Sequence, residues 1–218
     1  MIDISLEGCI GAGKSFLLNH LREHLGLSDV VFVDEPVQQW EKYRDGKGNI
    51  LQHFYADQTR WSFTFQWTCM ITRHNAMLES PHRSDPNALL FQERSVGADG
   101  NVFARLLHEN GHMSDIEWSV YTEWYDRLAE MLNVRSQAMV YMRVSPETAL
   151  KRIQQRGRMG EESITLEYLK QVCDKHEEWM VRNAQPTLIL EEGTPLDVCT
   201  DAIRSFILDQ QAKRNSPQ

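Results

Sequence analysis

Short apolar runs alternate with longer amphipathic stretches along the whole chain. The apolar runs predict strands at residues 2–6, 30–33, 88–91, 138–144 and 186–190. Apolar residues at helical spacing predict helices at residues 14–25, 58–79, 114–132, 145–152, 165–182 and 196–211. The run at 30–33, VVFV, is apolar at every position, which is typical of a strand buried on both faces of a parallel sheet.

Strands that alternate with helices over the full length predict an α/β fold, with helices flanking both faces of a five-stranded parallel sheet. The 218 residues fit one large domain. No repeat, low-complexity segment or linker divides the sequence, so we expect residues 1–218 to form a single domain. We expect the short tail KRNSPQ at the end of the sequence to be frayed.

Composition restricts the class of partner. Hydrophobic residues make up 41% of the chain and charged residues 25%, which is ordinary for a globular protein and argues against disorder. The net charge of −8 disfavours a protein that binds nucleic acid by neutralising its phosphates. No apolar stretch approaches the roughly 20 residues that a membrane helix needs. We therefore expect neither nucleic acid nor a membrane as a partner.

The cysteines and the N-terminus indicate a compartment. Cys9, Cys69, Cys173 and Cys199 are widely scattered, with no CxxC pair and no zinc-binding spacing. Free thiols in a reducing compartment are the simplest interpretation. The apolar strand pattern starts at Ile2, without the basic and apolar segments of a signal or transit peptide. We expect a cytoplasmic protein, with the nucleus as the alternative.

A complete G-x-x-x-x-G-K-S sequence follows the first predicted strand and precedes the first predicted helix. Its residues are Gly8, Cys9, Ile10, Gly11, Ala12, Gly13, Lys14 and Ser15. In such a P-loop the backbone N–H groups wrap a phosphate chain, the lysine reaches the β- and γ-phosphates, and the serine hydroxyl holds Mg²⁺. The helix that follows directs its N-terminal dipole at the anion. The motif predicts a P-loop NTPase-type sheet that binds ATP with Mg²⁺ and leaves the phosphoryl acceptor open.

Charged residues follow two further predicted strands. Glu35 comes after the strand at 30–33, and Glu93 and Arg94 come after the strand at 88–91. The carboxyl ends of parallel strands face the ligand crevice, which places these side chains beside the P-loop. A carboxylate there can accept the proton of an attacking hydroxyl, and an arginine can neutralise a transferring phosphoryl group. Taken alone, each of these groups could equally be surface charge.

Further motifs occur in an order that resembles the deoxycytidine/deoxyguanosine kinase family. They are the P-loop, EPV with Trp40, RWSFTFQ at 60–66, Glu93-Arg94-Ser95, RIQQRGR at 152–158 and LEYL at 166–169. The resemblance extends from Ile4 to the final predicted helix. It implies an enzyme of nucleotide salvage that transfers the γ-phosphoryl group of ATP to the 5′-hydroxyl of a deoxynucleoside. It also implies a homodimer built through long helices, for which the helices at 58–79 and 114–132 are candidates.

The resemblance assigns the reacting groups position by position. Glu35 is implied to be the general base that takes the 5′-hydroxyl proton. Arg94 is implied to hold the 5′-oxygen and the phosphoryl group. Glu93 is implied to help bind magnesium together with Ser15, while Lys14 contacts the transferred group.

The resemblance also assigns the nucleoside contacts. Gln66 is implied to bond the base edge, because an amide offers both a donor and an acceptor. Tyr55 and Glu161 are implied to grip the sugar 3′-hydroxyl. The base pocket is implied to be walled by Trp40, Phe65 and Phe103, with Phe103 stacking on the ring. Trp40 and Phe65 could instead be core aromatics, and Tyr55 a surface residue.

Three arginines are implied to form a lid over the ATP phosphates, at about residues 152–162. They are Arg152, Arg156 and Arg158, and they stand out in a chain of charge −8. Guanidinium groups suit bidentate phosphate contacts. The alternative is a solvated helix face, and the Glu161-Glu162 pair could be only helix N-terminal charge.

Arg73 and Asp99 bear on the choice of base. Arg73 lies seven residues beyond Gln66, on the same face of a helix. In the resembling family an arginine and an aspartate at these positions pair and meet the amino-bearing edge of the base, whereas thymidine-accepting relatives carry an apolar residue in place of Arg73. A buried guanidinium would also crowd the thymine methyl. This favours deoxycytidine or a purine deoxynucleoside over thymidine.

Some residues around this pair depart from the family pattern. Small or uncharged residues surround Asp99, namely Gly97, Ala98, Gly100 and Asn101, so this loop could lie elsewhere. Cys69 is small and lies one helical turn before Arg73, where it could set the pocket depth. A thymidine-accepting or broad-specificity kinase therefore stays open.

Three other classes of protein are less compatible with the sequence. A nucleoside-monophosphate kinase needs more than one strand-end arginine for its acceptor phosphate, and Arg94 is the clear candidate here. A catalytically silent kinase-like scaffold would be free to lose Lys14, Glu35 or Arg94, and all three are present. A GTPase would carry an NKxD-type guanine motif, which the sequence lacks.

Overall fold

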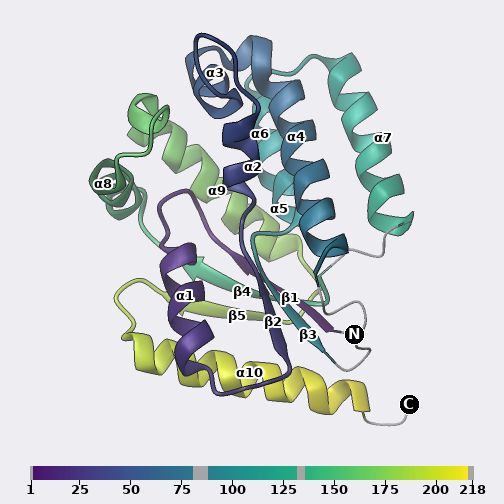
Figure 1. Cartoon of the computed structure of the whole chain (residues 1–218), viewed down its shortest axis with the longest axis vertical. Coiled ribbons are helices and arrows are strands. Elements are labelled where there is room, and N and C mark those ends of the chain that lie inside the picture. Colours follow the sequence, from purple (N-terminus) through teal and green to yellow (C-terminus); the bar gives the residue numbers. More distant parts are fainter. Residues whose placement is uncertain (1, 81–87, 132–135, 216–218) are drawn as a thin grey trace.

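Parallel strands form the centre of the structure (Figure 1), a computed structural model that describes residues 2–80, 88–131 and 136–215. The strands are β1 (Ile2–Glu7), β2 (Val30–Val33), β3 (Leu89–Glu93), β4 (Ala138–Arg143) and β5 (Thr187–Glu191). They lie in the order β2-β3-β1-β4-β5, and every neighbouring pair is parallel. The predicted five-stranded parallel sheet is confirmed, with strand ends within two residues of the expected ones.

The six predicted helices are all present. They are α1 (Lys14–His24), α4 (Gln58–Leu78), α7 (Asp115–Met131), α8 (Pro146–Arg156), α9 (Leu166–Arg182) and α10 (Leu196–Asn215). The predicted frayed tail is helical as far as Asn215, and residues 216–218, like the predicted helix end at 132, lie outside the described residues. Within the described ranges, no helix is long and apolar enough to cross a membrane.

Several short helices were not predicted. They are α2 (Val37–Lys42), α3 (Ile50–Ala56), α5 (Val96–Ala98), the π-helical turn η2 (Asp99–Ala104), α6 (Arg105–Glu109) and the 3₁₀ turn η3 (Glu161–Ser163). Helix α3 begins with a capping box, in which Asn49 and Gln52 each accept a hydrogen bond from the other's backbone N–H, at 2.9 and 3.0 Å. This N-x-x-Q spacing is the signal that would have revealed it.

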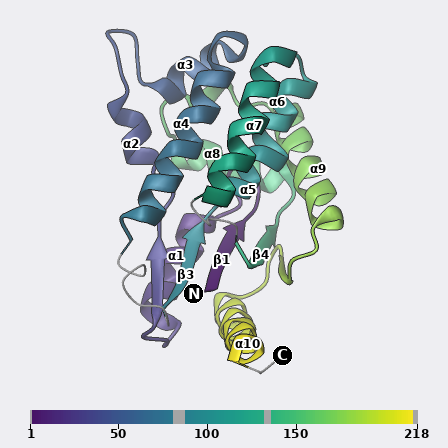
Figure 2. The ribbon, with the colours of Figure 1, turned by 90° about the vertical axis from the view of Figure 1, so that its right-hand side faces the viewer.

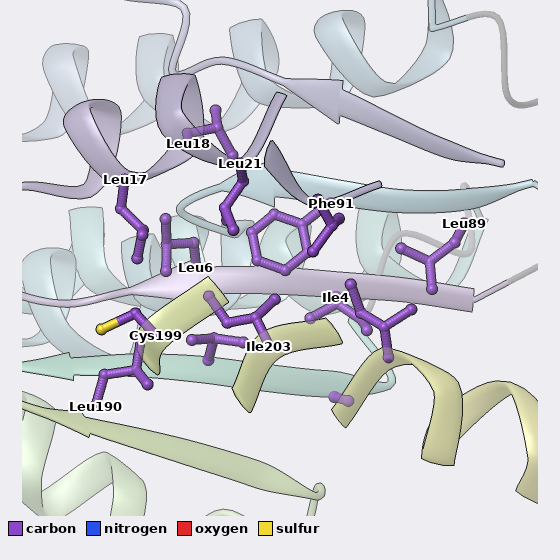
Figure 3. Packing of buried hydrophobic residues seen from close by; sticks show 14 of the residues in the cluster. Ile4, Leu6, Leu17, Leu18, Leu21, Leu89, Phe91, Leu190, Cys199 and Ile203 are labelled. Atoms are coloured by element: carbon purple, nitrogen blue, oxygen red, sulfur yellow. The ribbon is translucent and has the colours of Figure 1, made fainter. Parts of the chain in front are cut away.

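The helices cover the two faces of the sheet unequally. Helices α1 and α10 pack on one face, where Leu17 and Ile203 meet Leu6 and Phe91 in the main apolar core (Figure 3). The remaining long helices stack on the opposite face (Figures 1 and 2). The thick helical layer lies above the carboxyl ends of the strands, which gives room for a site there.

Strand β1 is apolar on one face and polar on the other. Ile4 and Leu6 point into the core, whereas Asp3, Ser5 and Glu7 alternate with them and are also buried. The Asp3 carboxylate accepts two hydrogen bonds from Gln92, at 2.7 and 3.0 Å. Burial raises the pKa of Asp3 to about 7, although the hydrogen bond from Gln92 partly offsets the effect. Two buried carboxyl groups therefore occupy opposite ends of one strand face.

Candidate active site

A cavity of about 730 Å³ lies at the carboxyl ends of the strands. Every predicted site residue except Gly8 and Cys9 lines it, so the structure brings together groups that are far apart in the sequence. The cavity reaches from the P-loop and α8 at one end to α3, α4 and η2 at the other.

Glycines shape the P-loop. Gly11 and Gly13 have φ angles of 80° and 98°, in the left-handed region that favours glycine. A Cβ at Gly11 would overlap the backbone carbonyl of Ala149 in α8, so this position also needs the smallest residue. Gly13 is the N-cap of α1, and the loop therefore delivers its backbone N–H groups to the start of that helix. The loop has the form of an anion cradle.

Lys14 is buried beneath this loop. Its Nζ donates hydrogen bonds to the backbone carbonyls of Gly8 (3.2 Å) and Cys9 (3.1 Å). Burial, followed by the neighbouring charge of Arg94, lowers the pKa of Lys14 to about 8. The ammonium group is thus held close to the cradle and loses its proton more readily than an exposed lysine.

Glu35 lies at the centre of a buried ion network. Its Oε1 accepts hydrogen bonds from Arg73 Nη2 (2.6 Å) and Arg94 Nε (3.0 Å). Burial alone would raise the pKa of Glu35, but the charges of Arg73, Arg94 and Lys14 outweigh it and hold that pKa well below its usual range. Glu35 is therefore a carboxylate at neutral pH. The bond from Arg73 to Glu35 was not expected from the sequence.

Arg73 also forms an ion pair with Asp99, as predicted, and both residues line the cavity. Arg73 Nε donates to Asp99 Oδ2 at 2.8 Å, and both side chains are 3% exposed. Burial raises the pKa of Asp99 to about 6, although the charge of Arg73 opposes the shift. The loop does not lie elsewhere despite its small residues, because Gly97 packs on the Trp179 ring and Gly100 on the Tyr125 ring.

Arg94 has a backbone conformation that is rare for a residue with a side chain. Its φ angle is 61°, the one positive value outside glycine among the described residues. Its guanidinium lies over the Phe103 ring, with 4.6 Å between Cζ and the ring centroid. Within the described part of the chain its buried Nη1 has no hydrogen-bond partner. The side chain thus carries a charge and a donor that are not fully satisfied by the protein.

Two oxygen ligands lie together beside the P-loop. Ser15 Oγ donates a hydrogen bond to Glu93 Oε1 at 2.7 Å. Hydroxyl and carboxylate oxygens are ligands that Mg²⁺ accepts, together with water and phosphate oxygens. The donor set therefore fits a magnesium ion carried by a nucleotide.

Aromatic side chains form the far end of the cavity. The Phe65 ring is stacked on Phe54 at 4.6 Å and meets the edge of Trp40 at 5.5 Å. Trp40 Nε1 donates to Thr72 Oγ1 at 2.8 Å, which fixes its ring. Gln66 is buried beside them, and its Oε1 has no hydrogen-bond partner within the described ranges. The predicted aromatics are thus core residues that also line the cavity.

The unpredicted helix α3 contributes a wall of this pocket. Leu51, Phe54 and Tyr55 all line the cavity from its inner face. Their spacing of three and four residues is the helical signal that the sequence offered. Leu51 and Phe54 are missing from the predicted set because α3 itself was missed.

The three arginines that were predicted to form a lid contact partners inside the protein. Arg152 Nη1 donates to the backbone carbonyl of Ala12 at 2.8 Å. Arg156 and Arg158 both bond the Glu161 carboxylate, at 2.7 and 3.2 Å. Glu161 is only 4% exposed, so it is more than helix N-terminal surface charge.

Comparison with known proteins decides the family. A sequence model of the deoxynucleoside kinase family matches residues 4–213. The chain belongs to the deoxynucleoside kinase family. This kinase is 35% identical over 180 residues to the probable deoxycytidine kinase of fowlpox virus (strain NVSL), which covers 83% of the chain and 72% of the relative.

Two human relatives differ in the base that their names give. Human deoxycytidine kinase is 36% identical over 202 residues, 84% of this chain and 77% of the relative. Human mitochondrial thymidine kinase 2 is 32% identical over 222 residues, 98% of this chain and 80% of the relative. The predicted family and reaction are confirmed: this is an ATP-dependent deoxynucleoside kinase. The relatives leave its preferred base open.

Proposed function

We propose that this kinase phosphorylates deoxycytidine or a purine deoxynucleoside in preference to thymidine, as a step of nucleotide salvage. The observation that carries the proposal is the buried Arg73–Asp99 pair, joined at 2.8 Å in the wall of the cavity. The pair presents a donor and an acceptor that complement an amino-bearing base edge. The buried guanidinium of Arg73 would also crowd the 5-methyl group of thymine.

Glu35 acts as the general base for the 5′-hydroxyl. Among the described residues both of its hydrogen bonds reach Oε1, which leaves Oε2 for a hydroxyl in the cavity. Glu35 is ionised at neutral pH. It can therefore accept the proton of the attacking hydroxyl as the new bond to phosphorus forms and the bond between the γ-phosphorus and ADP breaks. Arg94 holds the 5′-oxygen and the phosphoryl group through the part of its guanidinium that the protein does not satisfy.

Two kinds of cation face the phosphates: Lys14, which is held in the P-loop, and the arginines of the lid, which move when it closes. Lys14 and the backbone N–H groups of residues 8–15 bind the β- and γ-phosphates, and Arg152, already bonded to Ala12, borders the cradle. Arg156 and Arg158 close the lid by contacting phosphate oxygens. Ser15 and Glu93 would hold Mg²⁺, which would neutralise phosphate charge when bound.

The nucleoside side combines stacking and hydrogen bonds. Phe103 stacks on the base, between the walls that Trp40 and Phe65 form. Gln66 bonds the base edge, and the unpartnered Oε1 of this buried amide supports that role because buried acceptors are normally paired. Tyr55 and Glu161, both in the cavity wall, bind the 3′-hydroxyl.

The proposed base preference is tested by comparing nucleosides. We expect kcat/KM to be about tenfold or more higher for deoxycytidine or a purine deoxynucleoside than for thymidine, since a mispaired buried polar group costs roughly 1–3 kcal/mol. Steady-state assays with radiolabelled ATP measure it. A wild-type preference for thymidine would contradict the proposal.

Variants of the pair provide the control. Arg73→Met combined with Asp99→Ala should raise the thymidine-to-deoxycytidine ratio, and the two changes should not simply add because the residues touch. The ratio is the correct readout, because Arg73 also bonds Glu35 and its loss is expected to lower turnover with every nucleoside.

We propose that the kinase forms a homodimer through α4 and α7, which lie side by side (Figures 1 and 2). Ile116, Val120 and Trp124 recur every four residues on α7 and are 78%, 40% and 46% exposed, and Ile71 on α4 is 46% exposed. Sedimentation velocity should give a dimer, and Trp124→Glu should shift it toward monomer. A wild-type monomer at micromolar concentration would contradict this interface.

We propose a cytoplasmic location. All four cysteines are buried free thiols, including Cys9 in the P-loop. Unpaired cysteines are compatible with a reducing compartment. Imaging of the tagged protein in its source cells tests this assignment.

A further inference from the structure

Glu7 is a buried carboxyl group that the proposed chemistry does not use. It is the last residue of β1 and its relative exposure is 0%. Its Oε1 accepts hydrogen bonds from the backbone N–H of Ser95, at 3.0 Å, and from Ser95 Oγ, at 2.5 Å. Ser95 directly follows Arg94, so Glu7 contacts the backbone that carries the proposed phosphoryl-binding arginine.

Ser95 directs its hydroxyl group at β1. It is the N-cap of α5, a position where a serine hydroxyl normally accepts a hydrogen bond from the first turn. Here the hydroxyl makes no capping bond and donates its hydrogen to Glu7. The hydroxyl of Ser95 therefore serves the contact with β1 and does not cap α5.

The end of β1 accepts hydrogen bonds from the backbone N–H groups on either side of the Arg94 Cα. The Arg94 N–H donates to the Leu6 carbonyl at 3.0 Å, and the next N–H, that of Ser95, donates to Glu7. A non-glycine residue stays in the left-handed region only where its surroundings enforce it. At φ 61°, the Arg94 side chain reaches Glu35 and the Phe103 ring. An extended backbone at this point would direct the guanidinium elsewhere.

A comparison along the same strand face indicates that Glu7 is not there for stability alone. Both carboxylate oxygens of Asp3 have hydrogen-bond partners, whereas Glu7 Oε2 is buried without one among the described residues. A buried unpaired oxygen is destabilising. Glu7 thus has one unpaired oxygen, while its other oxygen fixes Ser95. This arrangement points to a role for Glu7 in the site.

We propose that Glu7 is a positioning residue that fixes Ser95 and thereby holds Arg94 in its left-handed conformation. This inference rests on the proposed role of Arg94 at the transferring phosphoryl group. The contact between Arg94 and the phosphoryl group strengthens in the transition state. The loss of Glu7 therefore lowers kcat more than it changes substrate binding.

The test compares two buried carboxyl groups of β1. Glu7→Ala should lower kcat by about 30- to 100-fold, the effect of misplacing a group by about 1 Å, with the nucleoside KM changed less than about threefold. Asp3→Ala, at the far end of the same strand face, should lower thermal stability and leave kcat within about twofold. Glu7→Gln offers an amide oxygen to the same two donors and should restore kcat to within about fivefold of wild type.

Further variants separate the possible failures. Glu7→Ala with Ser95→Ala should be no slower than Glu7→Ala alone, because both act on one contact. Normal kcat in Glu7→Ala, with Arg94→Ala inactive, would overturn the role of Glu7 and leave that of Arg94. Normal turnover in Arg94→Ala would instead refute the proposed function of Arg94 and, with it, this inference. If Glu7→Ala does not fold, Glu7→Asp, too short to reach Ser95, should show the same loss of kcat, and normal kcat in it would count against the proposal.

Discussion

Lys14→Ala is expected to abolish detectable phosphorylation. The γ-phosphoryl group carries charge in the transition state, and Lys14 supplies a cation held within the cradle by the carbonyls of Gly8 and Cys9. Its removal leaves that charge without this buried cation. Single-turnover assays with radiolabelled ATP measure the loss. A purified variant that kept about a tenth of wild-type activity would contradict the assigned role of the P-loop.

Two controls sharpen this result. Lys170→Ala removes an exposed lysine from α9 and should leave turnover unchanged. The pH profile gives an independent readout, because burial lowers the pKa of Lys14 to about 8. Below that pH the amine is charged and binds phosphate, and above it the charge is lost. The kcat/KM for ATP, which reports the free enzyme, should therefore fall as the pH rises beyond about 8.

Glu35→Gln is expected to lower turnover by about two to four orders of magnitude, with a much smaller change in nucleoside affinity. The amide keeps the shape of the side chain but cannot accept a proton. It also leaves Arg73 and Arg94 without the carboxylate that both of them bond. Steady-state kcat and calorimetric nucleoside binding separate the two effects.

The neighbouring acid is the matched control for Glu35. Asp34 is 62% exposed and pairs with Arg22 at 2.8 Å, away from the buried network. Asp34→Asn should keep turnover within about twofold, since an exposed pair contributes little. Near-normal turnover in Glu35→Gln would remove Glu35 from its role as base.

The sequence was most informative where chemistry follows directly from residue spacing. The P-loop could be located because its glycines and lysine are consecutive, and Glu35 and Arg94 because parallel strands bring their carboxyl ends to one edge. Contacts between elements were harder to predict. The sequence suggested that Arg73 pairs with Asp99, but whether a long guanidinium also reaches Glu35 depends on how α4 is set against the sheet.

Other features were missed for two different reasons. The helical segment from α5 to α6 was not predicted because Gly97 and Gly100 lower helix propensity. Glu7 lies just beyond the predicted strand at 2–6 and was given no role, because the full burial of a carboxyl group cannot be inferred from its neighbours in the sequence. The burial of Glu7 depends on packing against distant parts of the chain.

The two glycines beside Asp99 have a consequence for sequence change in this kinase. A Cβ at Gly100 would come within 2.7 Å of the Tyr125 ring on α7, and one at Gly97 within 3.0 Å of the Trp179 ring on α9. The rings of Tyr125 and Trp179 occupy the space that side chains at positions 100 and 97 would need. A larger residue at 97 or 100 therefore requires a smaller partner at 179 or 125. In this kinase, substitutions at 97 and 100 are therefore expected to be tolerated only together with compensating changes at 179 and 125.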